Sequence, residues 1–200
     1  AVFHLPKIAE PNGRITTPYL SGAKILAVSR RAKVIKFELK LLRPYKKADF
    51  AVLIFHLKMT GQLVLKSRSA LVFGGHPIAG VKSVPNKYTH AEFHLKNGWV
   101  LYFNDLRRFG YIKLLSHKEA DHFFSKFGVE PLGREFTLDK FLAILNRHKN
   151  TPIKAALLDQ AGVVGLGNIY VDEVCWMSGV RPSRRVKSIP TEEIQRIFKS

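Results

Sequence analysis

The chain has 200 residues, 46% of them hydrophobic, and is long enough to bury one large core or two small ones. Lysine and arginine total 33 against 15 acidic residues, a formal net charge of +18. This excess favours a polyanionic partner, nucleic acid before membrane, although a solvated basic surface would carry the same charge. The single cysteine, Cys175, excludes an internal disulfide and a four-cysteine zinc site and fits a reducing compartment. No apolar run approaches the ~20 residues of a membrane span.

The first part of the chain shows the patterns of β-strands. The run 51–57 is continuously apolar, as in a strand covered on both faces. Asn97-Gly98 lies between two further strands, and this pair favours the positive φ angles of a two-residue hairpin turn. The segment 67–86 carries several glycines and two prolines and is expected to form a loop. The expected strands are 25–40, 51–57, 87–95, 99–105 and 111–115.

Lys33 lies within the stretch 25–40, where a period of two places it on an apolar face. That face is formed by Ile35, Phe37 and Leu39. Partial burial lowers the pKa of a lysine, which makes its amine usable as a base, an acid or a nucleophile. The alternative is a lysine that extends to water or pairs with an acidic residue. The sequence leaves both interpretations open.

The pattern changes near Pro131-Leu132-Gly133, after which helices are expected. A helix over 137–149 has Thr137 as its N-cap and an apolar stripe. The residues of that stripe are Phe141, Leu142 and Leu145. This change divides the chain into an expected strand-rich domain, 1–132, and an expected helical domain, 133–200.

Three more helices are expected in the second part. One covers 151–160, with Thr151 as N-cap, Pro152 at the first helical position and Gly162 as its stop. Another covers 168–178 and ends at Gly179, and the last begins near Thr191.

The run GVVGLGN, residues 162–168, has closely spaced glycines before a helix. A dinucleotide-binding fold would require a strand before them, but a helix is expected there, which argues against that fold. Glycines also let a backbone approach a ligand closely, and the free amides of a helix start bind phosphate, to which Asn168 would add a donor. The alternative is an ordinary corner between two helices with Asn168 as the cap.

Arg107, Arg108 and Phe109 follow the expected strand 99–105. Two guanidinium groups beside an aromatic ring can bind phosphate and insert into a base stack. Met59 ends an apolar strand before a Thr-Gly turn. Its thioether can pack in the core or, together with Arg107 and Phe109, fill the gap left by an extruded base. The sequence does not show whether these three residues meet.

The eight histidines do not have the spacing of a zinc site. His90 and His94 lie on one face of an expected strand, without a third ligand. No metal site is therefore expected in this chain.

Taken together, these motifs resemble the formamidopyrimidine-DNA glycosylase/endonuclease VIII family of DNA repair enzymes, and the formamidopyrimidine branch more closely. The resemblance runs from about Leu26 to Ser200, and its strongest part is GNIYVDE after LLDQ, within 152–174. The other matching runs are RRAK (30–33), HLKMTGQL (56–63), KYTHAEF (87–93), FNDLRRFGYIKL (103–114), GVEPLG (128–133) and SGVRPSR (178–184).

The resemblance implies an α+β fold: an N-terminal β-sandwich domain followed by a helical domain with a helix–two-turns–helix motif. It implies base-excision repair by a DNA-formamidopyrimidine glycosylase and AP lyase. Such an enzyme flips an oxidised purine (8-oxoguanine or a formamidopyrimidine) out of the duplex, removes it and cuts the abasic strand by β,δ-elimination. The implied partner is damaged double-stranded DNA, and the implied setting is a monomer in the bacterial cytoplasm, associated with the nucleoid and not with a membrane.

The resemblance also implies roles for single residues. Lys33 matches a lysine that supports elimination and contacts phosphate, and Glu173 matches an acidic residue near the lesion pocket. Met59, Arg107 and Phe109 match the residues that fill the vacated space, with Arg107 facing the orphaned base.

Further matching positions imply DNA contacts. Lys149 and Asn168 match residues that contact the DNA backbone. Tyr88 stands where many members have a DNA-contacting histidine, and a tyrosine can still donate one hydrogen bond.

Two family features are absent from this sequence, which is therefore expected to be a fragment. The family nucleophile is an N-terminal proline followed by glutamate, whereas this chain begins Ala1-Val2-Phe3. The family's C-terminal zinc finger with four cysteines is also absent, so no cofactor is expected here, although the longer family form binds one zinc. Because an amine must attack the sugar C1′, only lysines or the α-amino group of Ala1 remain for that role.

Three functions are consistent with these observations. The first is the glycosylase and lyase itself. The second is a catalytically silent fragment that binds DNA or abasic sites, because the N-terminal nucleophile is absent. The third, a basic RNA-binding protein, rests on charge alone and lacks an RNP-type strand motif.

Overall fold

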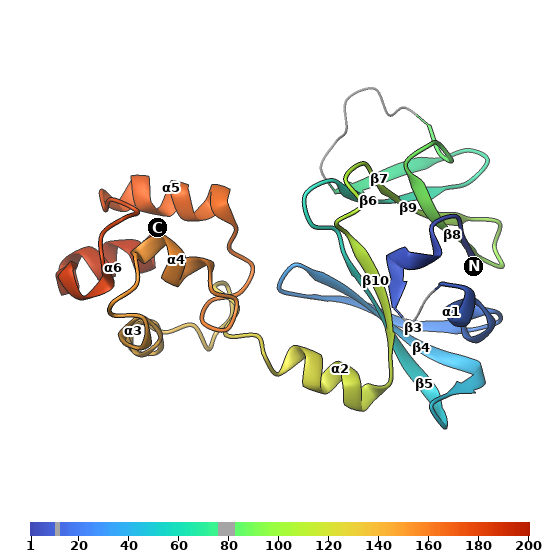
Figure 1. Cartoon of the computed structure of the whole chain (residues 1–200), viewed down its shortest axis with the longest axis horizontal. Coiled ribbons are helices and arrows are strands. Elements are labelled where there is room, and N and C mark those ends of the chain that lie inside the picture. The colour runs from blue at the N-terminus through green and yellow to red at the C-terminus, as the bar shows by residue number, and fades with distance from the viewer. Residues whose placement is uncertain (11–12, 76–82) are drawn as a thin grey trace. The chain divides into compact units, whose positions relative to one another are not determined.

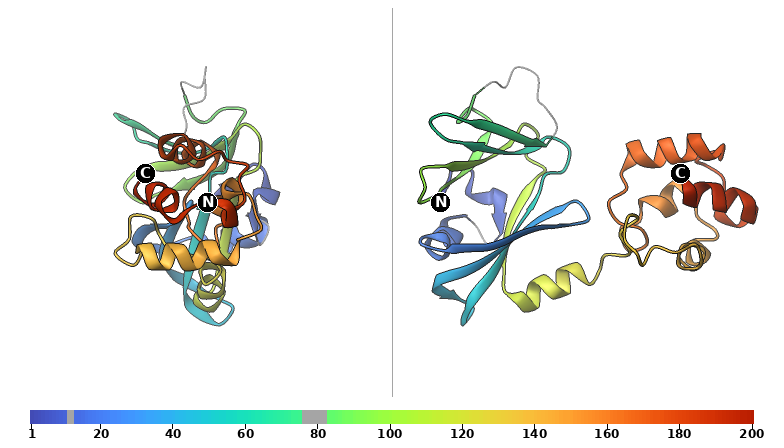
Figure 2. Two further views of the ribbon diagram at one scale, coloured as in Figure 1. Left: turned by 90° about the vertical axis from the view of Figure 1, so that its left-hand side faces the viewer. Right: turned by 180° about the vertical axis from the view of Figure 1, so that it is seen from behind.

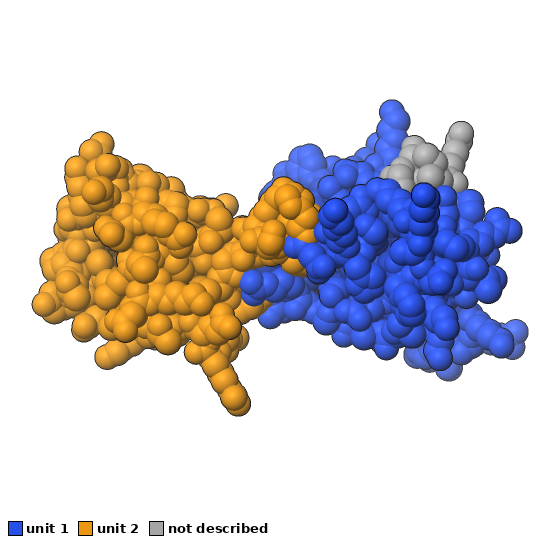
Figure 3. Space-filling view, turned by 90° about the horizontal axis from the view of Figure 1, so that it is seen from below, with its two compact units in different colours: residues 1–121 blue, residues 122–200 orange. Residues whose placement is uncertain are grey.

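The computed structural model describes residues 1–10, 13–75 and 83–200. These residues form two compact units, 1–121 and 122–200, which are coloured separately in Figure 3. The domain boundary proposed from the sequence, between 132 and 133, lies within the second unit. Each unit has its own hydrophobic core.

Unit 1 is a sandwich of two five-stranded sheets, visible as two layers in Figures 1 and 2. The strands pair antiparallel, except that β10 and β2 are parallel. In order, the first sheet contains β1 (Val2–Phe3), β8 (Thr89–His94), β9 (Val100–Asp105), β6 (Gly61–Lys66) and β7 (Leu71–Gly75). The second contains β2 (Ala9–Glu10), β10 (Tyr111–Leu115), β5 (Ala48–His56), β4 (Val34–Tyr45) and β3 (Lys24–Arg31). Two short helices, η1 (Pro6–Ile8) and α1 (Gly13–Leu20), lie near the N-terminus.

The core of the sandwich is centred on β5. Its residues 51–55 are buried, which confirms the strand covered on both faces. The ring of Phe55 lies 5.6 Å from that of Phe93 and 6.1 Å from that of Phe103, centroid to centroid, and both partners belong to the other sheet. Burial of each such side chain stabilises the fold by about 1.5–3 kcal/mol, so these contacts hold the two sheets together.

The stretch 25–40 is two strands rather than one. Arg31 pairs with Val34, and Ala32 and Lys33 form the turn between β3 and β4. Ala32 has a φ of 54°, in the left-handed region. The prediction that Lys33 lies on an apolar strand face is therefore wrong, because alternation continues across a tight hairpin and does not reveal the turn.

Two other predictions in unit 1 need correction. Part of the expected loop 67–86 is strand β7, which pairs with β6 at the sheet edge, and 76–82 lie outside the described residues. The hairpin between β8 and β9 is confirmed, but its turn has three residues, 96–98, because Leu95 donates to the carbonyl of Trp99 at 2.8 Å. Gly98 takes the positive φ, at 82°.

Unit 2 is helical, as expected. Its helices are α3 (Leu138–Arg147), α4 (Ile153–Leu158), η2 (Val186–Ser188), α5 (Asn168–Ser178) and α6 (Thr191–Lys199). Thr137 caps α3 through a hydrogen bond from the Lys140 amide at 3.3 Å, and Gly179 ends α5 with a φ of 71°, so both predictions are confirmed. The apolar stripe of α3 contributes Phe141 and Leu145 to the core.

Helix α4 begins later than predicted, with Pro152 rather than Thr151 as its N-cap. The reason is a contact with a segment more than 30 residues further along the chain. The Thr151 carbonyl accepts from the Val186 amide at 3.1 Å, and the Ile153 amide donates to the Arg184 carbonyl at 2.8 Å. This short antiparallel bridge, between Pro152 and Arg185, leaves Pro152, with a ψ of 142°, at the N-cap position.

Helix α2 (His117–Phe124) was not predicted, although its start carries a capping signal, Ser-x-x-Glu. The Glu119 carboxylate accepts from the amide and the hydroxyl of Ser116 at 2.9 and 2.8 Å. It also pairs with the amine of Lys46. The bond from Lys46, followed by those from Ser116, lowers the pKa of Glu119 to about 2.

In the part of the chain that the structure describes, no helix combines the length and apolarity needed to span a bilayer.

We expect Glu119→Gln to destabilise unit 1 by about 0.5–1 kcal/mol at pH 7, because glutamine keeps the capping box but loses the charge that pairs with Lys46 and favours the helix start. The folded pKa lies below the ordinary value of 4.5, so this stabilisation is present above pH 4.5 and is lost as the pH falls towards 2. The difference in the free energy of unfolding between variant and wild type, measured with urea, should therefore become smaller below pH 4.5. Asp121→Asn, an exposed position in the same helix, is the control. A gap that does not depend on pH would contradict the assignment.

Candidate nucleic-acid interface

Strand pairing brings three connections of unit 1 to one end of the sandwich. In the second sheet, the end of β5 at His56 pairs with the start of β4 at Val34 and the start of β10 at Tyr111. In the first sheet, the start of β6 at Gly61 pairs with the end of β9 at Asp105. The β3–β4, β5–β6 and β9–β10 connections therefore share this end. We call it the loop end; it comprises residues 32–33, 56–60, 88 and 105–111.

Met59, Arg107 and Phe109 meet at the loop end. The Nη1 atom of Arg107 lies 3.3 Å from the Sδ atom of Met59, and its guanidinium carbon lies 5.9 Å from the centroid of the Phe109 ring. All three are exposed, Met59 and Phe109 by 59% each. Exposed apolar groups around a cation can insert between bases and replace an extruded nucleotide.

Asp105 holds the loop that carries Arg107 and Phe109. It is fully buried, and its Oδ1 accepts hydrogen bonds from the hydroxyl of Thr60 and, at 3.1 Å, from the amide of Arg107. Its Oδ2 accepts from the amide of Gly110 at 2.7 Å. One carboxylate thus ties both ends of the loop to the β5–β6 connection. Sequence reasoning missed Asp105 and Thr60, although an aspartate that bonds the amide two residues on is a recognised turn signal.

The loop is strained at Arg108, whose φ is 61°. Such a conformation costs a residue other than glycine about 1–3 kcal/mol and persists only where its surroundings impose it. The bonds to Asp105 on either side of Arg108 provide that constraint. At Gly110, a Cβ atom would lie 2.8 Å from the buried ring of Phe103, so a larger residue would force the ring or the loop to shift.

Lys33 and Lys58 are two cationic side chains at the loop end, and the imidazole of His56 is close enough to sense both charges. The pKa of His56 is lowered to about 4, first by burial and then by the charges of Lys58 and Lys33. Burial of the amine, followed by the charge of Lys58, lowers the pKa of Lys33. The amide of Lys58 donates to Nδ1 of His56 at 3.0 Å, so the neutral ring carries its proton on Nε2.

Tyr88 also lies at the loop end. Its carbonyl accepts from the amide of Asp105 at 2.9 Å, and its partly buried ring lies 5.1 Å from the Lys87 amine. All five site residues predicted in this unit therefore share one end. Those residues are Lys33, Met59, Tyr88, Arg107 and Phe109.

In unit 2, Gln160 organises the turn between α4 and α5. Its Oε1 accepts from the amide of Gly165, and its Nε2 donates to the carbonyls of Leu158 and Leu166, each at 3.0 Å. Gly165 has a φ of 86°, which glycine adopts without strain. Sequence reasoning used the LLDQ motif but did not assign Gln160 this role.

Asn168 is the first residue of α5, and Gly167 is the N-cap. The interpretation of Asn168 as a cap is therefore wrong. Its side chain is exposed beside the first amides of an eleven-residue helix, where donors and the helix dipole favour an anion.

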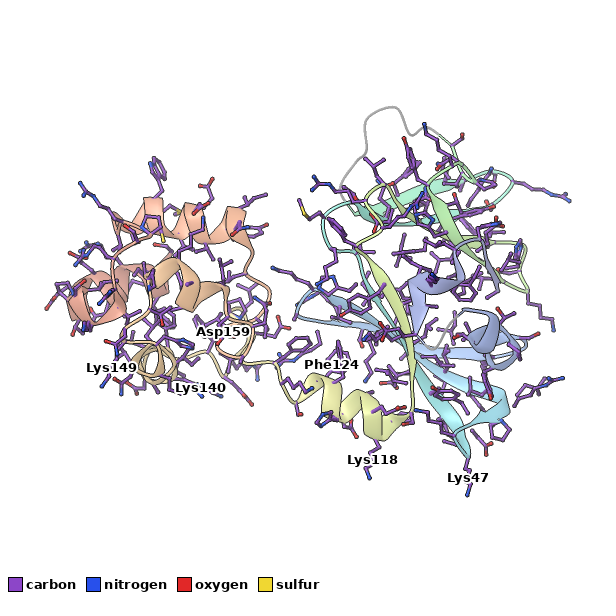
Figure 4. All side chains as sticks on the ribbon, viewed as in Figure 1. Lys47, Lys118, Phe124, Lys140, Lys149 and Asp159 are labelled. Carbon is purple, nitrogen blue, oxygen red and sulfur yellow. The ribbon has the colours of Figure 1, made fainter. Side chains whose placement is uncertain are left out.

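Lys149 and Glu173 lie on different parts of unit 2. Lys149 is exposed after α3, where Figure 4 labels it, and its carbonyl accepts from the Lys187 amide at 2.9 Å. Glu173 is exposed on α5 and lines a surface hollow with Trp176 and Arg181. Their assignments as a backbone contact and a lesion-pocket residue stay predictions.

Among the residues with described positions, no group of three or more His, Cys, Asp or Glu side chains could hold a metal ion.

Two family models match the chain. The formamidopyrimidine-DNA glycosylase N-terminal domain matches residues 2–112, and the formamidopyrimidine-DNA glycosylase H2TH domain matches residues 127–200. The two matches correspond to the sandwich and to the helices.

Curated relatives carry the same description. The formamidopyrimidine-DNA glycosylase of Herpetosiphon aurantiacus is 33% identical over 196 residues, which cover 98% of this chain and 64% of that protein. That of Streptococcus pyogenes serotype M6 is 36% identical over 196 residues, which cover 96% of this chain and 62% of the relative. The chain thus spans less than two thirds of the length of these relatives.

Solved structures of similar fold contain DNA. A complex between Lactococcus lactis Fpg and DNA with an abasic site has a TM-score of 0.80 and 26% identity, and covers 99% of this chain and 65% of that one. A complex of a Lactococcus lactis Fpg mutant with Fapy-dG-containing DNA has the same TM-score, identity and coverage.

We expect Asp105→Ala to destabilise unit 1 by about 2–3 kcal/mol, because it leaves the amide of Gly110 without an acceptor and the amide of Arg107 with the Thr60 hydroxyl alone. Hydrogen exchange at both amides should accelerate in the native state. Asp49→Ala, an exposed aspartate of β5, should change the stability by less than about 0.5 kcal/mol. Equal effects of the two substitutions would refute the role of Asp105.

His56 should make unit 1 less stable in mild acid. Its folded pKa, about 4, is below the ordinary 6.5, so the unfolded chain binds the proton first. The contribution of this linkage to the free energy of unfolding is therefore fully present above pH 6.5 and is lost as the pH falls towards 4. Denaturant unfolding between pH 7.5 and 5 should show a smaller decline for His56→Gln. Parallel curves for variant and wild type would rule out this linkage.

Proposed function

The chain belongs to the formamidopyrimidine-DNA glycosylase family, and from this premise we propose that it binds damaged duplex DNA through the loop end of unit 1 and the start of α5 in unit 2. The convergence of Met59, Arg107 and Phe109 carries the proposal. Extrusion of a nucleotide costs a few kcal/mol of lost stacking, which apolar side chains in the vacated space offset. Arg107 offers donors to the base that has lost its partner, and Asn168 offers a donor to phosphate.

We propose further that the protein takes part in base-excision repair of oxidised purines, 8-oxoguanine and formamidopyrimidines, followed by β,δ-elimination at the abasic site. The names of the relatives and the complexes of Lactococcus lactis Fpg with abasic-site and Fapy-dG-containing DNA support this substrate class. Lys33 supports the elimination, because its lowered pKa leaves more of the amine unprotonated at neutral pH. We also propose that it acts in the bacterial cytoplasm at the nucleoid, as a monomer; the bacterial origin of the relatives supports the bacterial setting.

The family's zinc has no role in this proposal. The described residues offer no ligand set for it, and Cys175 is the single cysteine of the chain.

One observation favours the alternative function, binding without turnover. Val2 pairs with Glu92, so the α-amino group of Ala1 lies towards the far end of β8, where Ala1 lines a cavity with Leu95 and Lys96. β8 starts at Thr89, next to the loop end, which places Ala1 about 13 Å along the strand from that start. The α-amino group of Ala1 in this chain is therefore not placed to attack a sugar at the loop end.

The test is binding of the 200-residue chain to duplexes with an abasic-site analogue or an undamaged base pair at the same position. Wild type should prefer the abasic duplex, and Arg107→Ala should reduce that preference about tenfold while changing affinity for undamaged DNA little, since one good base contact contributes about 1–3 kcal/mol. Equal losses on both duplexes would contradict the role of Arg107.

Borohydride treatment with a natural abasic site separates the two functions. A covalent adduct that Lys33→Ala abolishes supports the lyase. Specific binding without an adduct supports the silent binder, and no preference for damaged DNA would reject both.

A further inference from the structure

Lys58 lies in the β5–β6 connection, directly before Met59, with a φ of 52°. Glycine adopts this left-handed conformation without strain, whereas lysine does not. Strained residues are retained mainly where their side chains or their geometry serve a function. The position thus carries a lysine despite a backbone that favours glycine.

The amine of Lys58 is directed over the ring of Tyr111, 5.8 Å from its centroid. A second amine, that of Lys113, lies 5.0 Å from the same ring but is paired with Glu10 at 2.7 Å. Within the described parts of the chain, no carboxylate lies at ion-pair distance from the Lys58 amine. Among these residues, no acidic side chain therefore balances its charge.

The backbone of Lys58 has a second effect, on His56. Its amide donates to Nδ1 of the ring at 3.0 Å, and the ring lies against Tyr111 with centroids 5.4 Å apart. The ring therefore keeps its Nε2–H as a donor. Lys58 thus supplies an ammonium group and also fixes a neutral donor beside it, and both groups suit a phosphate oxygen.

We propose that Lys58 is a phosphate-binding and positioning residue: its amine binds a backbone phosphate of the DNA next to the gap filled by Met59, Arg107 and Phe109, and its left-handed backbone orients His56. The inference rests on the proposed DNA binding and adds to it a specific residue. A backbone phosphate is the target because lysine acts as a point charge on a flexible stem and does not read base edges.

The chain offers a closely matched control. Lys47 is also exposed, also has a positive φ, 65°, and lies in the β4–β5 turn, at the other end of the second sheet. Figure 4 labels it at the tip of that hairpin. Lys58→Gly and Lys47→Gly each remove one positive charge and replace one lysine whose backbone is strained in the left-handed region. The two variants therefore have the same net charge, and their stabilities should change in the same direction.

Affinity for a duplex with a tetrahydrofuran abasic-site analogue should be measured by fluorescence anisotropy from about 0.05 to 0.2 M salt. Lys58→Gly should weaken binding about five- to tenfold and reduce the slope of log affinity against log salt by about one. Lys47→Gly should change affinity less than about twofold, since its charge lies far from the site relative to the screening length. Lys58→Arg should keep most of the affinity.

NMR titration of His56 provides a readout that needs no DNA. Lys58→Gly should raise the pKa of His56, since it removes a nearby positive charge, and Lys47→Gly should not. If wild type binds the abasic duplex and the two glycine variants are equal, the role of Lys58 is wrong and the proposed function stands. If wild type does not prefer the abasic duplex, both the role of Lys58 and the proposed function are wrong.

Discussion

The loop end depends on one buried carboxylate. Asp105 accepts hydrogen bonds from Thr60, from the amide of Arg107 and from the amide of Gly110, and so joins the two connections that cross between the sheets. A fully buried carboxylate would be costly without such partners. With them, it holds Met59 against Arg107, and the strained backbone at Arg108 becomes tolerable. The surface proposed to replace an extruded nucleotide is thereby formed before any DNA is bound.

Unit 2 uses the same physical device with a neutral side chain. The amide of Gln160 bonds three backbone groups of the α4–α5 turn, as the carboxylate of Asp105 bonds two in its loop. In both units a side chain satisfies the backbone of an irregular segment, and the segment then presents exposed donors such as those of Asn168. Pre-formed loops lose less conformational entropy on binding.

The electrostatics of the loop end favour a polyanion. Burial and then the charges of Lys58 and Lys33 lower the pKa of His56, and burial and then the charge of Lys58 lower the pKa of Lys33, so this end of the sandwich carries several cationic side chains. The protein tolerates this because the two lysines are exposed and the imidazole stays neutral near pH 7. A DNA backbone would bring negative charge to this end, which agrees with the net charge of +18.

The sequence by itself determined the elements whose signals are local: the buried strand 51–57, the Thr137 cap, the Gly179 stop and the family motifs. Tertiary structure decided the rest. Met59 and Arg107 are 48 residues apart and meet because of strand pairing, and a bridge with Arg185 leaves Pro152 rather than Thr151 at the N-cap of α4. Periodicity along a chain reports near neighbours, whereas the register between strands decides which distant side chains share one end of a sheet.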